Sequence, residues 1–176
     1  MSRYRRIWHP GGTYFFTHTL LCRVDDLLVR QVDALRAAVA QVRTAHPFAI
    51  LAWVVLPDHF HCVIRLPEND DRFDVRWRLI KQHFSRQIPP TEWLSRTRQR
   101  RSERGIWQRR YWEHLIRDEH DLTAHMDYVH INPVKHGLAS SALAWPYSTF
   151  HRLVRAGMYP HDWAGSPAAE ALSCND

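Results

Sequence analysis

The stretch from Phe48 to Leu66, FAILAWVVLPDHFHCVIRL, contains two apolar runs that are separated by Pro57-Asp58. Both runs are short and rich in β-branched and aromatic residues, and Pro-Asp is a turn signal. We therefore expect a β-hairpin whose strands span 48–56 and 59–66.

The second strand of this hairpin begins with two histidines, His59 and His61. Alternate residues of a strand point to the same face, so both imidazoles should lie on one side while Phe60 and Cys62 point into a core. Neutral imidazole is the commonest protein ligand for divalent transition metals, which makes the pair a candidate half of a metal site. A chain with 13 histidines also contains close pairs by chance, so a purely structural role stays open.

The segments around the hairpin predict the fold class. We expect a strand at 13–22, which is rich in Thr, Tyr and Phe, and amphipathic helices at 26–45 and 72–87. A fourth strand is expected at 106–117. The order predicts an α+β, ferredoxin-like (β-α-β-β-α-β) antiparallel sheet with two helices on one face. The other face, or an edge, would be open for a ligand, and the histidines would lie on a central strand.

One more helix is predicted after this unit. The residues 118–121, Asp-Glu-His-Asp, are a helix-start signal, and Pro133 and Gly137 should close the helix. Tyr128 and Asn132 are four residues apart and share a helix face, so they can offer a phenol nucleophile and an amide oxygen side by side. For a lone helical tyrosine, a packed aromatic is the alternative role, so the chemical interpretation rests on the combination.

Six short motifs carry a resemblance to a known family. They are Tyr4-Arg5-Arg6, Gly11–Thr17, Leu56–His61, Ile106–His114, Tyr128–Gly137 and Trp145–Phe150. In this order they resemble the REP-associated tyrosine transposases, which are relatives of the insertion-sequence transposases that cut and rejoin single-stranded DNA, within the HUH nucleases. The resemblance extends up to Gly165, and several motifs in one order are more specific than any single motif.

The resemblance implies roles for the site residues. His59 and His61 would be metal ligands, Asn132 a third ligand, and Tyr128 the nucleophile, with Mg²⁺ or Mn²⁺ as the metal. The implied activity is metal-dependent nicking and strand transfer on single-stranded REP-type hairpin DNA through a 5′-phosphotyrosine intermediate. A non-catalytic hairpin-binding protein and a water-using metal-dependent phosphodiesterase are the alternatives. Monomers and homodimers that exchange the tyrosine helix both stay open.

A free phenol has a pKa near ~10, so Tyr128 would need activation by positive charge, by the metal or by a base. His130, Lys135 and His136 are close enough in sequence to be considered as helpers. A solvated surface position is nevertheless the expected role of each.

The chain is basic, with 24 Lys and Arg against 18 Asp and Glu and a net charge of +6, so it should attract nucleic acid. Residues 95–104 hold five arginines in a predicted loop, and this connection is often shorter in the family that the chain resembles. A solvated linker is the alternative role for this segment. The candidates for DNA contact are Arg3, Tyr4, Arg5, Arg6, Arg96, Arg98, Arg100, Arg101, Arg104, Arg109, Arg110 and Lys135.

Length and composition predict one domain. A chain of 176 residues, 45% of them hydrophobic, suits a single catalytic domain over 1–165, followed by a weakly ordered tail over 166–176. The apolar runs are too short for a membrane span, and the first residues lack a secretory signal, so we expect a cytoplasmic, nucleoid-associated protein. Three cysteines without paired spacing fit that compartment. Cys22 and Cys62 are expected to be small buried strand residues.

Overall fold

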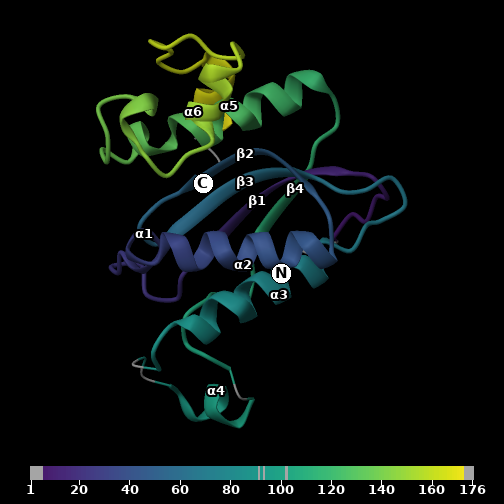
Figure 1. The fold of residues 1–176 in the computed structure, drawn as a ribbon, viewed down its shortest axis with the longest axis vertical. Coiled ribbons are helices and arrows are strands. Elements are labelled where there is room, and N and C mark those ends of the chain that lie inside the picture. The colour runs from purple at the N-terminus through teal and green to yellow at the C-terminus, as the bar shows by residue number, and fades with distance from the viewer. Residues whose placement is uncertain (1–5, 91, 93, 102, 173–176) are drawn as a thin grey trace.

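The computed structural model describes residues 6–90, 92, 94–101 and 103–172. Four strands form one antiparallel sheet in the order β2-β3-β1-β4 (Figure 1). They are β1 (Thr13–Thr19), β2 (Ala49–Val55), β3 (His59–Arg65) and β4 (Trp112–Leu115). The predicted α+β, ferredoxin-like order is confirmed, and β3 is a central strand as expected.

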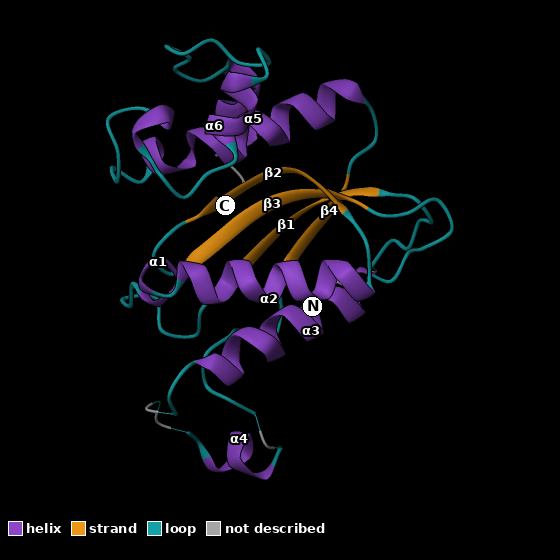
Figure 2. Ribbon diagram, viewed as in Figure 1, coloured by secondary structure: helices purple, strands orange, loops and turns teal. Residues whose placement is uncertain are grey.

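The helices lie on both faces of the sheet (Figure 2). They are α1 (Leu27–Arg30), α2 (Val32–Ala45), α3 (Phe73–Gln87), α4 (Arg96–Arg100), α5 (Glu119–Lys135), α6 (Phe150–Arg155) and α7 (Pro167–Leu172), with a 3₁₀ turn η1 (Ala142–Ala144). The helices α2 and α3 cover one face, while α5 covers the other. The face that we expected to be open is therefore closed over β2 and β3, because apolar residues of α5 pack there into a second core.

Strand alternation divides β3 between these two cores. Phe60 and Cys62 are fully buried with residues of α2 and α3, as predicted. Val63 is buried in the second core, beneath α5. His59 and His61 differ from Phe60 by one residue, so they point toward α5 and the tyrosine that it carries.

The strands β1 and β4 are both shorter than the sequence predicts. Regular pairing of β1 ends at Thr19, and β4 has only four residues instead of the expected 106–117. Beyond the end of β1, the chain meets the segment before β4 through one isolated bridge, Leu20 to Trp107, and through single backbone hydrogen bonds. Cys22 lies beyond the end of β1 and is exposed, so its predicted burial in a strand is wrong.

Three helical segments also differ from expectation. The helix predicted at 26–45 is two helices, α1 and α2, that are divided at Gln31. The predicted arginine loop contains the short helix α4. In the tail expected to be weakly ordered, residues 167–172 form α7, whose Ala169 is buried in the second core with residues of α5, while 173–176 lie outside the described residues. None of the helices in the described ranges is long and apolar enough to cross a membrane.

The end of α5 corrects one expectation and confirms another. Pro133 lies inside the helix, which continues to Lys135, so the proline does not close it. Gly137 does close it: its φ is +66°, and the N–H groups of Gly137 and Leu138 donate to the carbonyls of Val134 and Pro133 at 2.9 and 2.8 Å. This pair of bonds is a Schellman motif, which favours glycine because the left-handed conformation strains other residues.

Candidate active site

The two histidines of β3 face α5 and are held by their neighbours. His59 and His61 are both buried, and their ring centres lie 4.9 Å apart. The Nδ1 of His59 is 2.6 Å from Asp58 Oδ1, and the Nδ1 of His61 is 2.8 Å from Thr17 Oγ1. When each Nδ1 carries the proton and donates it, each Nε2 keeps a lone pair for a metal ion.

Asn132 lies beside His61 without a satisfied hydrogen-bond network. Its side chain is completely buried and close enough to interact with His61. Among the described residues, however, the Oδ1 and Nδ2 of Asn132 and the Nε2 of His61 find no hydrogen-bond partner of normal geometry. Buried polar atoms without partners are rare and costly, so their grouping indicates a ligand. Two imidazole nitrogens and one amide oxygen are donors that suit a divalent cation.

The electrostatics keep both rings in the form that binds metals. Burial lowers the pKa of His61 well below its ordinary value, and the neighbouring His59 and His136 lower it further. Burial also lowers the pKa of His59, although Asp58 partly offsets this effect. Both imidazoles are therefore neutral near pH 7, and no proton has to leave them before an ion binds.

Tyr128 meets this group from α5. The tyrosine is buried, and its ring packs edge-on against His61 with the ring centres 5.3 Å apart. A second edge contact, at 5.8 Å, is made with Phe15 of β1. Lys135 Nζ lies 4.4 Å from the centre of the Tyr128 ring, two helical turns further along α5. The structure therefore brings His59, His61, Tyr128 and Asn132 together, with a cation beside the phenol.

The two histidines considered as helpers lie in different environments. His130 is fully buried and lies 3.1 Å from Thr149 Oγ1, so its predicted surface position is wrong. Burial lowers the pKa of His130 to about 3, which keeps this ring neutral. His136 is exposed as expected, but its ring centre lies 5.3 Å from that of His59. It therefore borders the site.

The candidate DNA contact Arg104 serves the fold. Its guanidinium donates to the carbonyl oxygens of Ser85, Ile88 and Pro89 at 2.8 to 3.1 Å. It also pairs with Glu92 through two of its nitrogens. Because Nε, Nη1 and Nη2 all donate to these groups, Arg104 holds the arginine segment against the end of α3.

Most of the other basic candidates among the described residues are exposed, and some of them form ion pairs. Arg6 pairs with Glu113 at 3.0 Å, while Arg98 and Arg109 flank Glu103 at 3.8 and 2.9 Å. Arg96, Arg100, Arg101 and Arg110 of the same region are exposed as well. The candidates Arg3, Tyr4 and Arg5 lie outside the described residues. Figure 1 shows α4 at the opposite end of the molecule from α5, so the arginine segment does not reach Tyr128.

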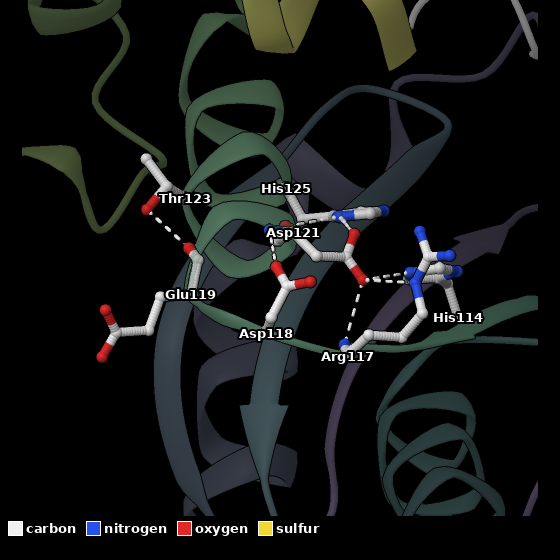
Figure 3. Close-up of polar contacts among 7 residues, drawn as sticks. All are labelled: His114, Arg117, Asp118, Glu119, Asp121, Thr123 and His125. Atoms are coloured by element: carbon white, nitrogen blue, oxygen red, sulfur yellow. Dashed lines mark hydrogen bonds and ion pairs between the residues drawn. The ribbon is translucent and has the colours of Figure 1, made fainter.

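Sequence reasoning missed several polar groups near Tyr128. Asp58 and Thr17 position the two histidines, and the only signal for them was their place next to His59 and opposite His61 in the sheet. A separate cluster of three donors, His114, Asp121 and His125, lies at the start of α5 (Figure 3). Because His114 is on β4 and the other two residues are on α5, the spacing in the sequence does not predict that the three side chains meet.

A ferredoxin-like sheet that presents two same-face histidines to a helical tyrosine and asparagine defines the class of single-tyrosine HUH transposases. Comparison with known proteins agrees. The chain is 47% identical over 168 residues to a protein of Haemophilus influenzae, covering 95% of this chain and 96% of that protein. It is 48% identical over 165 residues to a protein of Escherichia coli K12, covering 94% and 92%. The names of both contain the words REP-associated tyrosine transposase.

A solved structure of a REP-associated tyrosine transposase bound to a REP hairpin has a TM-score of 0.81 and 48% identity, covering 94% of this chain and 93% of that one. No family model matches the sequence. Identity at this level over nearly the full chain is decisive, and the chain belongs to the REP-associated tyrosine transposases.

Proposed function

We propose that this chain is a metal-dependent enzyme that nicks and rejoins single-stranded DNA at REP-type hairpins, with Tyr128 as its nucleophile. The observation that carries the proposal is the group of buried, unsatisfied donor atoms on His61 and Asn132, which lie beside the tyrosine. Burying such atoms without partners is costly, and here they lie together beside a possible nucleophile, as a ligand site requires. The substrate class follows from the related structure, whose protein is bound to a REP hairpin.

His59, His61 and Asn132 would hold the ion, through both Nε2 atoms and the amide oxygen. A bound Mg²⁺ or Mn²⁺ supplies charge neutralisation at the phosphate and orients it for in-line attack. Asp58 and Thr17 would hold the two rings by their Nδ1 atoms, which leaves both Nε2 atoms for the ion.

Tyr128 would attack phosphorus with its phenolic oxygen. The new bond joins this oxygen to the 5′ phosphate, and the bond to the neighbouring 3′ oxygen breaks, which leaves a free 3′-OH. The energy of the broken ester stays in the phosphotyrosine, so the reverse attack by a 3′-OH rejoins DNA without a nucleotide cofactor. Lys135, beside the ring, favours the negative charge that develops on the phenol as its proton leaves.

The surface for the DNA backbone would include arginines whose guanidinium groups face solvent. Arg96, Arg100, Arg101 and Arg110 are exposed and can form bidentate bonds with phosphate. Lys135 would contact the strand near Tyr128, and the segment with Arg3, Tyr4 and Arg5 is a further candidate. Arg104 does not belong to this set, because its guanidinium already donates hydrogen bonds to the carbonyls at the end of α3.

The nucleophile is tested by Tyr128→Phe, assayed with a labelled single-stranded REP hairpin and Mn²⁺ on denaturing gels. We expect a covalent protein–DNA adduct with the wild-type protein and none with the variant, because only the hydroxyl is removed. Hairpin binding on native gels should be nearly unchanged. Tyr147→Phe is the matched control, since it removes a hydroxyl from a partly buried tyrosine outside the group around Tyr128, and it should cut normally.

Other outcomes identify the alternatives. Cleavage without an adduct, retained in Tyr128→Phe, would identify a phosphodiesterase that uses water. A shift on the native gel without any cleavage by the wild-type protein would identify a hairpin-binding protein.

A further inference from the structure

A second cluster of metal-type donors lies where β4 meets the start of α5 (Figure 3). The Nε2 of His114, on β4, is 2.8 Å from Asp121 Oδ2, while the Nδ1 of His125, one turn along α5, is 3.0 Å from Asp121 Oδ1. One ligand atom from each residue lies within 4.8 Å of the other two. Among the described residues, this is the one group of three His, Cys, Asp or Glu side chains with that property.

We propose that His114, Asp121 and His125 form a second metal site, which binds a Zn²⁺-type ion in preference to Mg²⁺. Two imidazoles and one carboxylate are the donors of open zinc sites, whereas Mg²⁺ prefers an all-oxygen shell. Zinc bonds of about 2.0–2.1 Å in a tetrahedron separate neighbouring ligand atoms by about 3.3 Å. The observed contacts, 2.8 Å to one carboxylate oxygen and 3.0 Å to the other, are a few tenths of an ångström shorter than this, and all three ligand atoms lie within 4.8 Å of one another.

The cluster holds charges that suit a cation. Burial raises the pKa of Asp121, but hydrogen bonds from His114 and from the Arg117 backbone outweigh this and lower it to about 2, so the carboxylate is ionised. Burial lowers the pKa of His125, which keeps that ring neutral. A neutral imidazole can place its one proton on either nitrogen, so the inner nitrogen can bind an ion while the outer one keeps the proton.

Arg117 is the group that competes for the carboxylate. Its Nε lies 3.3 Å from Asp121 Oδ2, but its side chain is 75% exposed. An ion pair so open to water contributes little, and the side chain can turn into solvent when a metal arrives. The His125 Nδ1 also lies 2.8 Å from the backbone oxygen of Asp121, so it donates within the helix until an ion takes the place of its proton.

The cluster is accessible to an ion, because it borders a cavity. The three residues line a cavity of about 490 Å³, which Trp112, Thr17 and Tyr128 also line. The cluster therefore opens onto a space that Tyr128 also lines. Phe15 packs against His125 at 5.0 Å and against His61 at 5.6 Å between ring centres, and so lies between the two groups of donors.

The proposed ion would join β4 to the first turns of α5. Asp121 and His125 lie on the helix that carries Tyr128, while His114 belongs to the sheet. A bridge between them would hold the start of the tyrosine helix against the sheet edge. This role is distinct from that of His59, His61 and Asn132, and it does not depend on DNA cleavage.

The test is a titration of the metal-free protein with Co²⁺, which reports tetrahedral coordination by visible absorption, followed by competition with Zn²⁺ in excess Mg²⁺. His61→Ala removes the site on β3 and isolates the proposed one. We expect His61→Ala to bind one Co²⁺ per chain, which Zn²⁺ displaces and Mg²⁺ does not. The double variant His61→Ala/His114→Gln should lose this binding at least tenfold, while Gln keeps a donor for Asp121.

A His61→Ala protein that binds no Co²⁺ would overturn the proposal, whatever the fate of cleavage by the wild-type protein. Equal Co²⁺ affinity with and without His114→Gln would overturn it as well, because the ion would then lie elsewhere. If His114→Gln fails to fold, Asp121→Asn replaces it, since this change preserves the side-chain shape and removes the charge. DNA takes no part in these measurements, so failure of the proposed nicking activity leaves their outcome unaffected.

Discussion

Asn132 is the residue at which stability and function oppose each other most clearly. Its amide is completely buried on α5, and neither polar atom has a partner of normal geometry among the described residues. Leaving such an amide unsatisfied costs about 1–3 kcal/mol. An apolar residue of similar size would fold better at this position, which indicates that Asn132 is present for a ligand.

Asn132→Leu should therefore raise stability and abolish function. In EDTA, we expect its free energy of unfolding in urea to rise by about 1 kcal/mol, because the unsatisfied amide is gone and Leu keeps the number and branching of the side-chain heavy atoms. Mn²⁺-dependent cleavage of hairpin DNA should be lost. A variant that is less stable than the wild type and still cuts DNA would show that the amide is satisfied within the protein and is not a ligand.

Lys81 on α3 should make the stability of the protein depend on pH. Burial, together with the nearby Arg6, lowers the pKa of Lys81 from 10.5 to about 8. Its ammonium lies 5.2 and 5.4 Å from the ring centres of Trp107 and Tyr111. Between pH 8 and 10.5 the unfolded chain binds more protons here than the folded one, so this residue makes stability rise with pH across that window.

Lys81→Met keeps the packing and removes the charge. At pH 7 we expect the variant to be more stable than the wild type by about 1 kcal/mol or more, and the difference should shrink as pH rises toward 10.5. Urea unfolding of both proteins at matched pH values measures this. A constant difference across the window would mean that Lys81 titrates normally in the folded protein.

At the scale of elements, the end of α5 links folding to the site. Gly137 terminates the helix at φ +66° directly after Lys135 and His136, which lie beside Tyr128 and His59. Gly157 ends α6 with the same pair of backbone hydrogen bonds at φ +73°. An added Cβ would contact nothing within 4 Å at either glycine, so only the backbone conformation resists substitution.

Gly137→Ala and Gly157→Ala are thus matched variants. Each should lower the free energy of unfolding by about 1 kcal/mol, the usual strain of a left-handed alanine. Only Gly137→Ala should also weaken Mn²⁺ binding and slow cleavage, because it displaces the last turn of the tyrosine helix. Equal kinetic effects from both variants would show that global stability, and not the position of α5, limits the activity.

The elements also show why sequence predicted some features and not others. The hairpin 48–66 was predictable because short apolar runs and a turn signal act locally, and His59 and His61 share a face because strand residues alternate. Pro133 was misjudged because a proline costs one hydrogen bond, which the packing of α5 onto β2 and β3 outweighs. The cluster at Asp121 joins two elements, so it required the tertiary structure.

At the scale of the whole molecule, the sheet separates two regions of different character. The buried donors and Tyr128 lie between the sheet and α5, while the arginine segment lies at the far end, beyond α3 (Figure 1). Duplex or single-stranded DNA that contacts both regions must pass around the sheet. The arginines would then affect how tightly the strand is held but not the chemical step at Tyr128.

The triple variant Arg96→Gln/Arg100→Gln/Arg101→Gln tests this division, because it removes three exposed charges. If each contacts one phosphate of single-stranded DNA, the slope of log affinity against log salt should decrease by about two units. Cleavage at saturating DNA should be unchanged. Arg104→Gln is the contrasting variant: it breaks the contacts that anchor the segment, so we expect a lower melting temperature with a smaller change in slope. An unchanged slope in the triple variant would show that these arginines are only solvated, and the DNA contacts would then have to lie on the side of the molecule that carries Lys135.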